Sequence, residues 1–175
     1  MLPVDLCGAV RDAHHDLTRV LVAMNALTTP RDQLLEQLDS FRLMVGIHAG
    51  AEARVYEVVL AAIPGDGALA SLAATTEDEH LDQVGAVDAL ACMDPGSLKW
   101  HEQMRELRSR VVEHAASSER RLARLQARMP GLVGRLAREY ATASMRILSV
   151  APPPLWMVRP RRTRAVGKTL PLPMR

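Results

Sequence analysis

The chain has 175 residues, of which 48% are hydrophobic and only 3% aromatic, and its abundant Ala, Leu, Val, Met, Arg and Glu favour helices over strands. Two cysteines exclude a disulfide framework, no run of about 18 apolar residues is present to cross a membrane, and the N-terminus lacks a signal-peptide pattern, so we expect a cytoplasmic protein. The formal net charge of +2 divides into +6 for residues 151–175 and therefore −4 for residues 1–150, which is a mildly acidic body with a basic tail.

Breaks at proline, glycine and small polar residues predict five helices. Their expected ranges are about 5–27, 31–62, 76–92, 98–129 and 131–148. In the third, the cluster TTEDE has the composition of a helix cap with acids in the first turn, so the helix is expected to start there. Long helices joined by short breaks predict an all-α, up-down-up-down four-helix bundle with an additional C-terminal helix, all within a single domain, 1–150.

The tail, 151–175, holds six of the 11 prolines and has no helical period, so we expect an extended or disordered basic segment. Such a segment is most often a solubilising extension, and contact with an acidic partner is the alternative. Trp156 is its only aromatic residue for stacking on bases, so no specific nucleic-acid binding is expected.

Four consecutive predicted helices each carry a histidine on or near the face that their apolar residues define. These histidines are His14, His48, His80 and His114. In the first helix His14 shares its face with Leu17 and Leu21, whereas the adjacent His15 leans toward the side. A single inward histidine is most often a core residue with a hydrogen-bond partner. Four of them in one small core are costly to bury unless they are paired or bind a metal.

Two glutamates accompany these histidines. Glu52 lies one turn after His48, whereas Glu119 lies five residues after His114, about 140° round an ideal helix, and so needs a long reach or a local π-bulge. Imidazoles suit iron, copper or zinc, and carboxylates can bridge two cations in a bundle core. Four imidazoles and two carboxylates are too many donors for one tetrahedral zinc and about the number that two metal ions need.

The order of these residues resembles the hemerythrin-like family, or HHE cation-binding domains, in its bacterial form H, HxxxE, H, HxxxE. The matching pieces are VRDAHHDLTRVL, HAGAEARVYEVVL, EDEHLDQVGAVDAL and VVEHAASSERRLARL, and they cover roughly residues 5–150. The resemblance implies a four-helix bundle that holds two non-haem irons with an oxo or hydroxo bridge, with Glu52 and Glu119 as bridging carboxylates. Members of the family bind dioxygen, sense oxygen or iron, handle nitric oxide or decompose hydrogen peroxide.

The third helix departs from the pattern of the hemerythrins, which carry an HxxxH pair there. Thr76 stands four residues before His80, and Val84 stands four residues after it. One iron is therefore expected to have an open position, which favours chemistry with peroxide or dioxygen over closed, reversible carriage. Glu77 or Glu79 could instead supply an oxygen ligand.

The last motif is stretched, because Ser118 occupies the position four residues after His114 and Glu119 comes one residue later. A carboxylate five residues after the histidine also occurs in hemerythrins, so the resemblance tolerates this spacing. Tyr56, one turn after Glu52, is a further candidate for the metal pocket, although a core tyrosine is the commoner interpretation.

The leading hypothesis is a hemerythrin-like diiron protein that binds or reacts with dioxygen, hydrogen peroxide or nitric oxide, with catalase-like or peroxide-reducing activity left open. Its expected metal ligands are His14, His48, Glu52, His80, His114 and Glu119, with His15, Tyr56 and Glu77 as less certain candidates. A second hypothesis is a metal-dependent sensor or interaction module that signals through the bundle and the basic tail. A third is a metal-free helical scaffold with structural histidines.

Overall fold

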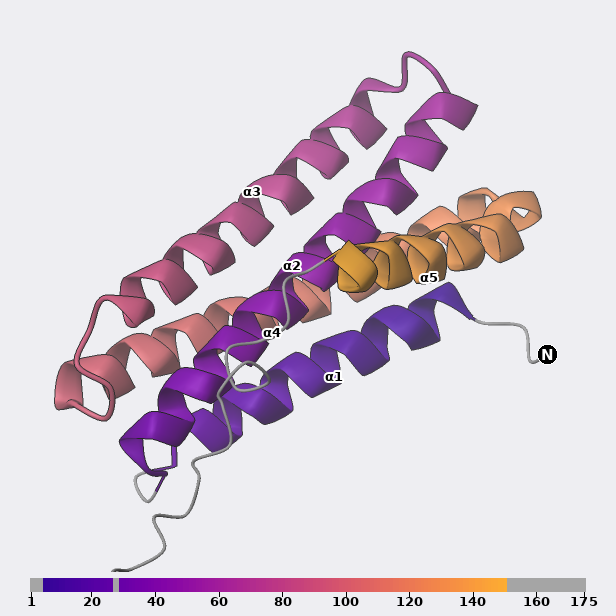
Figure 1. The fold of residues 1–175 in the computed structure, drawn as a ribbon. Coiled ribbons are helices and arrows are strands. Elements are labelled where there is room, and N and C mark those ends of the chain that lie inside the picture. Colours follow the sequence, from indigo (N-terminus) through magenta and orange to yellow (C-terminus); the bar gives the residue numbers. More distant parts are fainter. Residues whose placement is uncertain (1–4, 27–28, 151–175) are drawn as a thin grey trace, which may run out of the picture.

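The computed structural model describes residues 5–26 and 29–150, and all regular structure within these ranges is helical (Figure 1), as the sequence predicts. The elements are α1 (Leu6–Met24), α2 (Arg31–Ala62), α3 (Gly67–Ala91), α4 (Leu98–Arg128), the short 3-10 helix η1 (Pro130–Leu132) and α5 (Val133–Val150). The predicted basic tail, 151–175, lies outside the described residues.

Short polar side chains cap the first turns of α1 and α4. The Asp5 carboxylate accepts hydrogen bonds from the backbone N–H groups of Cys7 and Gly8. The Ser97 hydroxyl accepts one from the backbone N–H of Trp100, at 3.2 Å. Each cap satisfies backbone donors that have no partner within the first turn, which stabilises a helix by about 1 kcal/mol.

The third helix begins earlier than the sequence pattern predicts. α3 starts at Gly67, where the carboxylate of Asp66 accepts a hydrogen bond from the backbone N–H of Leu69 at 3.0 Å. Thr76, the predicted start, lies inside the helix and donates its hydroxyl to the carbonyl of Leu72, 3.0 Å away. The prediction was wrong because the segment ALASLAA is itself a strong helix former and has its own cap.

The helices pack around a shared core. α2 contacts α1 and α3, α4 also contacts α1 and α3, and α5 lies against α2 and reaches α1 (Figure 1). Within the set of the first four helices, each therefore touches two of the other three, as the helices of a bundle do. The alternating up-down order stays a prediction. Within the described residues, no helix combines the length and the apolar character that crossing a membrane requires.

Two apolar clusters fill the core, and a polar layer lies between them. Along α1, Val10 belongs to one cluster and Leu17 to the other, with His14 between them. The same division occurs on α2, α3 and α4. The buried side chains of the polar layer are His14, His48, Glu52, Thr76, His80, Gln83, His114 and Ser118. The fold thus carries its candidate functional residues in the middle of the bundle, with apolar packing on both sides.

Candidate metal centre

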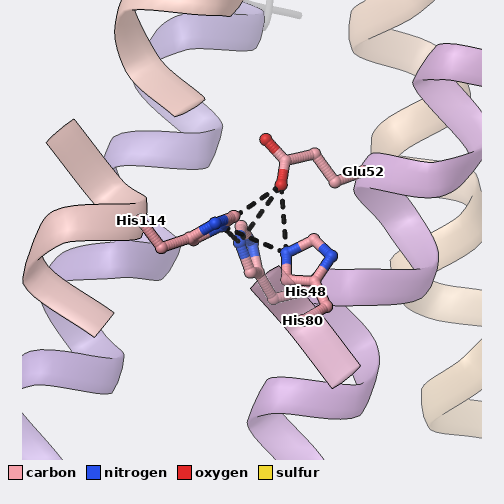
Figure 2. A group of neighbouring side chains, drawn as sticks. All are labelled: His48, Glu52, His80 and His114. Carbon is pink, nitrogen blue, oxygen red and sulfur yellow. Dashed lines mark hydrogen bonds and ion pairs between the residues drawn. The ribbon is translucent and has the colours of Figure 1, made fainter. Parts of the chain in front are cut away.

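One group of side chains among the described residues is close enough to hold a metal ion. Its ligand atoms come from α2, α3 and α4 and all lie within 4.8 Å of one another (Figure 2). The group consists of His48, Glu52, His80 and His114. All four residues are buried, and the side chain of Glu52 is 0% exposed.

The imidazoles converge on one carboxylate oxygen. Oε2 of Glu52 lies 3.2 Å from Nε2 of His80, 3.4 Å from that of His114 and 3.6 Å from that of His48. Nε2 of His114 lies 3.1 Å from Nε2 of His80 and 3.3 Å from Nε2 of His48. Four donors bound tetrahedrally to one ion at about 2.0–2.1 Å are roughly 3.3 Å apart. The distances between these donor atoms therefore suit one bound ion.

Hydrogen bonding alone does not satisfy these atoms. A ring nitrogen has one in-plane position, which holds either a proton or a lone pair. Nε2 of His114 nevertheless faces both His80 and His48 as well as Glu52. Oε2 of Glu52 is buried without a hydrogen-bond partner among the described residues. A cation at the shared centre would engage all of these lone pairs at once, so the residues fit a metal.

The pKa directions of Glu52 and His48 also suit a metal. Burial acts to raise the pKa of Glu52, but the close imidazoles of His114, His80 and His48 outweigh it, so this pKa lies well below its ordinary value. Burial lowers the pKa of His48 well below its ordinary value. Burial also acts to lower the pKa of His114, but Glu52 and Glu79 outweigh it and raise the net value. An ionised Glu52 and a neutral His48 are the forms that bind a metal ion, whereas a protonated His114 would have to release a proton when the ion binds.

Two further side chains orient the rings from behind. Nδ1 of His114 lies 2.8 Å from Oε2 of Glu79, and Arg121 donates to that same oxygen at 2.9 Å. Nδ1 of His48 lies 3.2 Å from the hydroxyl of Tyr140, which α5 supplies. Such contacts fix which nitrogen faces the metal. Glu79 thus contacts a histidine and does not lie where the oxygen ligand considered for the third helix would be. No pattern in the sequence pointed to Tyr140.

The two remaining expected ligands lie beside the group of four. His14 is buried, and its Nε2 lies 3.0 Å from Nε2 of His48. Its Nδ1 faces Oε1 of Glu119 at 3.6 Å. The Glu119 side chain is 29% exposed and accepts a hydrogen bond from Nε of Arg11 at 3.2 Å. The structure therefore brings His14 to the centre and leaves Glu119 at its rim.

The less certain candidates lie outside the group. His15 and Glu77 are exposed. Tyr56 is buried, and its hydroxyl lies 3.4 Å from the hydroxyl of Thr76. Burial raises the pKa of Tyr56, which therefore stays protonated at neutral pH. Among the described residues, the polar neighbour that the structure gives Tyr56 is Thr76, not a histidine of the centre.

Within the described residues, three cavities border histidines of the centre. One, which we term the α2–α3 groove, has a volume of about 420 Å³ and is lined by His80, Tyr56 and small apolar residues such as Ala53 and Ala73. Another, of about 310 Å³, lies between α3 and α4 and is lined by polar residues that include His114. A smaller one, of about 200 Å³, is lined by His48 and Tyr140.

Comparison of the chain with protein-family models, with curated proteins and with solved structures finds no match. The resemblance to the hemerythrin-like family therefore rests on the order and spacing of the residues. The metal interpretation rests on the convergence of buried donors at Glu52.

Proposed function

We propose that this protein is a hemerythrin-like metal protein whose buried centre holds iron and binds or reacts with dioxygen, hydrogen peroxide or nitric oxide. The observation that carries the proposal is Oε2 of Glu52, a buried carboxylate oxygen with three imidazole nitrogens within 3.6 Å and no hydrogen-bond partner among the described residues. Imidazole and carboxylate donors suit iron, zinc and copper. The resemblance favours iron, which when bound supplies redox chemistry and a position for a small ligand.

The protein's own residues would hold, orient and shield that chemistry. Glu52 carries the negative charge that offsets a cation, and Glu79 and Tyr140 fix two of the imidazole rings. The apolar clusters on both sides of the polar layer exclude bulk water. His80 has the most exposed side chain of the four, at 7%, and it lines the α2–α3 groove. The groove is therefore the proposed route for a small neutral molecule.

The resemblance adds a finer expectation, namely two irons bridged by Glu52 and Glu119 with His14 as a further ligand. Near-ultraviolet absorption bands of an oxo-bridged pair would support that form. We expect the bundle to have the alternating up-down order whether the centre holds one ion or two. The number of ions is thus a separate question from whether the centre binds metal.

Metal analysis tests the proposal directly. Protein purified without oxygen should contain iron, and His48→Ala and Glu52→Ala should lose it while keeping their helical circular dichroism. Loss of peroxide consumption in the same variants would favour the hypothesis that the protein is an enzyme. A partner protein captured only when residues 151–175 are present would favour the hypothesis that it is a metal-dependent sensor. Folded wild-type protein that takes up no ferrous iron would overturn the proposal and leave the metal-free scaffold.

A further inference from the structure

The centre has two halves that correspond in sequence and in space. In the first half, Nε2 of His14 and Nε2 of His48 are 3.0 Å apart, and the ring centres are 4.5 Å apart. In the second half, Nε2 of His80 and Nε2 of His114 are 3.1 Å apart, and the ring centres are also 4.5 Å apart. A matched pair of metal sites would need each half to have a carboxylate of its own.

Only the first half carries a carboxylate that faces the Nε2 atoms of the imidazoles, because Glu79 in the second half contacts Nδ1 of His114. Glu52 follows His48 by one turn, and the corresponding position after His114 is Ser118. Ser118 is buried and donates its hydroxyl to Oε1 of Glu52. Oε2 therefore remains as the oxygen of Glu52 that faces the imidazoles. A bridge that used both oxygens would place a second ion on the oxygen that already accepts the Ser118 hydrogen bond.

Glu119 does not replace the missing carboxylate. It lies at the rim of the centre, with one oxygen paired to Arg11. Its other oxygen faces Nδ1 of His14, whereas Nε2 of His14 is the nitrogen that faces His48. Glu119 and the imidazoles of the group of four are thus on opposite sides of the His14 ring. An ion held by Glu119 would not share the donors of that group.

We propose that the centre binds a single metal ion, held by His48, Glu52, His80 and His114, and that His14 and Glu119 are not needed to hold it. This inference rests on the proposed function and deepens it. It differs from the iron pair that the resemblance implies, because the second half of the centre offers no carboxylate of its own toward the Nε2 atoms of the imidazoles. Glu52 acts as a ligand through one oxygen, with Ser118 holding the other.

Titration of the metal-free full-length protein with Co²⁺ under argon, followed by visible absorption, measures stoichiometry and affinity without an activity assay. We expect saturation at one equivalent per chain. The two halves supply matched variants. His80→Gln and Glu52→Gln should weaken Co²⁺ binding by about 100-fold or more, whereas His14→Gln and Glu119→Gln should change it by less than about 5-fold. Circular dichroism establishes that each variant is folded.

A second comparison tests the role of Ser118. Ser118→Ala frees Oε1 of Glu52 and should weaken Co²⁺ binding by roughly 10-fold, as loss of a hydrogen bond to a ligand does. Its control is Ser117→Ala, because the Ser117 hydroxyl donates to the backbone carbonyl of His114, at 2.9 Å, instead of to a ligand atom. Equal affinities in the two variants would count against the single-oxygen role of Glu52.

Two results separate failure of this inference from failure of the proposed function. Saturation at two equivalents, or equal losses for His14→Gln and His80→Gln, would overturn the single ion while leaving metal binding intact. Folded wild-type protein that binds neither Co²⁺ nor ferrous iron would overturn both.

Discussion

Oε2 of Glu79 lies 2.8 Å from Nδ1 of His114, on the side of the ring opposite the nitrogen that faces Glu52. Arg121 in turn donates to both oxygens of Glu79. Burial acts to raise the pKa of Glu79, but Arg121 and His114 outweigh it and hold this pKa below its ordinary value. A carboxylate behind a metal-facing imidazole increases its basicity and fixes its orientation.

Replacing Glu79 by Gln keeps the size of the side chain and removes its charge. We expect Glu79→Gln to weaken metal binding by about 10-fold to 100-fold, because His114 loses a charged partner. Competition with a coloured chelator measures the affinity. Glu77→Gln, at an exposed position of the same helix, is the control and should bind metal like the wild type. Equal affinity in the two variants would mean that Glu79 does not tune the centre.

Removing the Tyr140 hydroxyl should affect the centre from the side of α5. Tyr140→Phe deletes the partner of Nδ1 of His48 and should lower metal affinity by about 10-fold, with a stability cost of about 1 kcal/mol. Tyr56→Phe is the matched control, since its hydroxyl contacts Thr76 and not a histidine. The idea fails if chelator competition gives Tyr140→Phe the wild-type affinity.

Acid should destabilise the metal-free protein through His14. Burial lowers the pKa of His14 to about 4, whereas an unfolded histidine has a pKa of about 6.5. Between these values the unfolded chain binds a proton that the folded chain does not, so stability falls as the pH falls from about 6.5 to about 4. The contribution of His14 is at most roughly 3 kcal/mol. The raised pKa of His114 acts in the opposite sense, because its stabilisation is lost as the pH rises.

Urea unfolding of the metal-free protein at pH 7 and pH 5 measures this effect. We expect the wild type to be less stable at pH 5, and His14→Gln to reduce the difference between the two pH values. A difference as large in His14→Gln as in the wild type would show that His14 does not cause it.

Filling the α2–α3 groove should slow access to the centre without emptying it. Ala53→Phe places a ring among the residues that line the groove beside His80. We expect normal metal content and slower reaction with nitric oxide or peroxide in stopped-flow measurements. Ala61→Phe, at an exposed position of α2 outside the groove, is the control. Unchanged rates in Ala53→Phe would assign entry to a route other than the groove, beside His114 or beside His48.

Helical periodicity was enough to predict which histidines lie in the core. A step of about 100° per residue separates His14 from His15, and the first is buried whereas the second is exposed. The same reasoning placed Glu52 beside His48, since a spacing of four residues keeps both side chains on one face. These results depend only on local geometry, which the sequence specifies directly.

Contacts between helices could not be predicted in this way. Spacing alone left open whether Glu119 would reach the centre, and its pairing with Arg11 depends on how α1 and α4 pack. Tyr140 was missed because the placement of α5 across α2 depends on close packing. At Gly50, an added Cβ would lie only 2.5 Å from Cδ1 of Ile147.

The polar layer divides the hydrophobic core into two clusters, and each of the first four helices contributes residues to both. In the metal-free protein the residues at this boundary are imidazoles and a carboxylate, which attract one another less strongly than they attract a cation. An ion bound there joins α2, α3 and α4 at a single point and stabilises only the folded state. Metal binding would therefore strengthen the coupling between the two ends of the bundle when the protein unfolds.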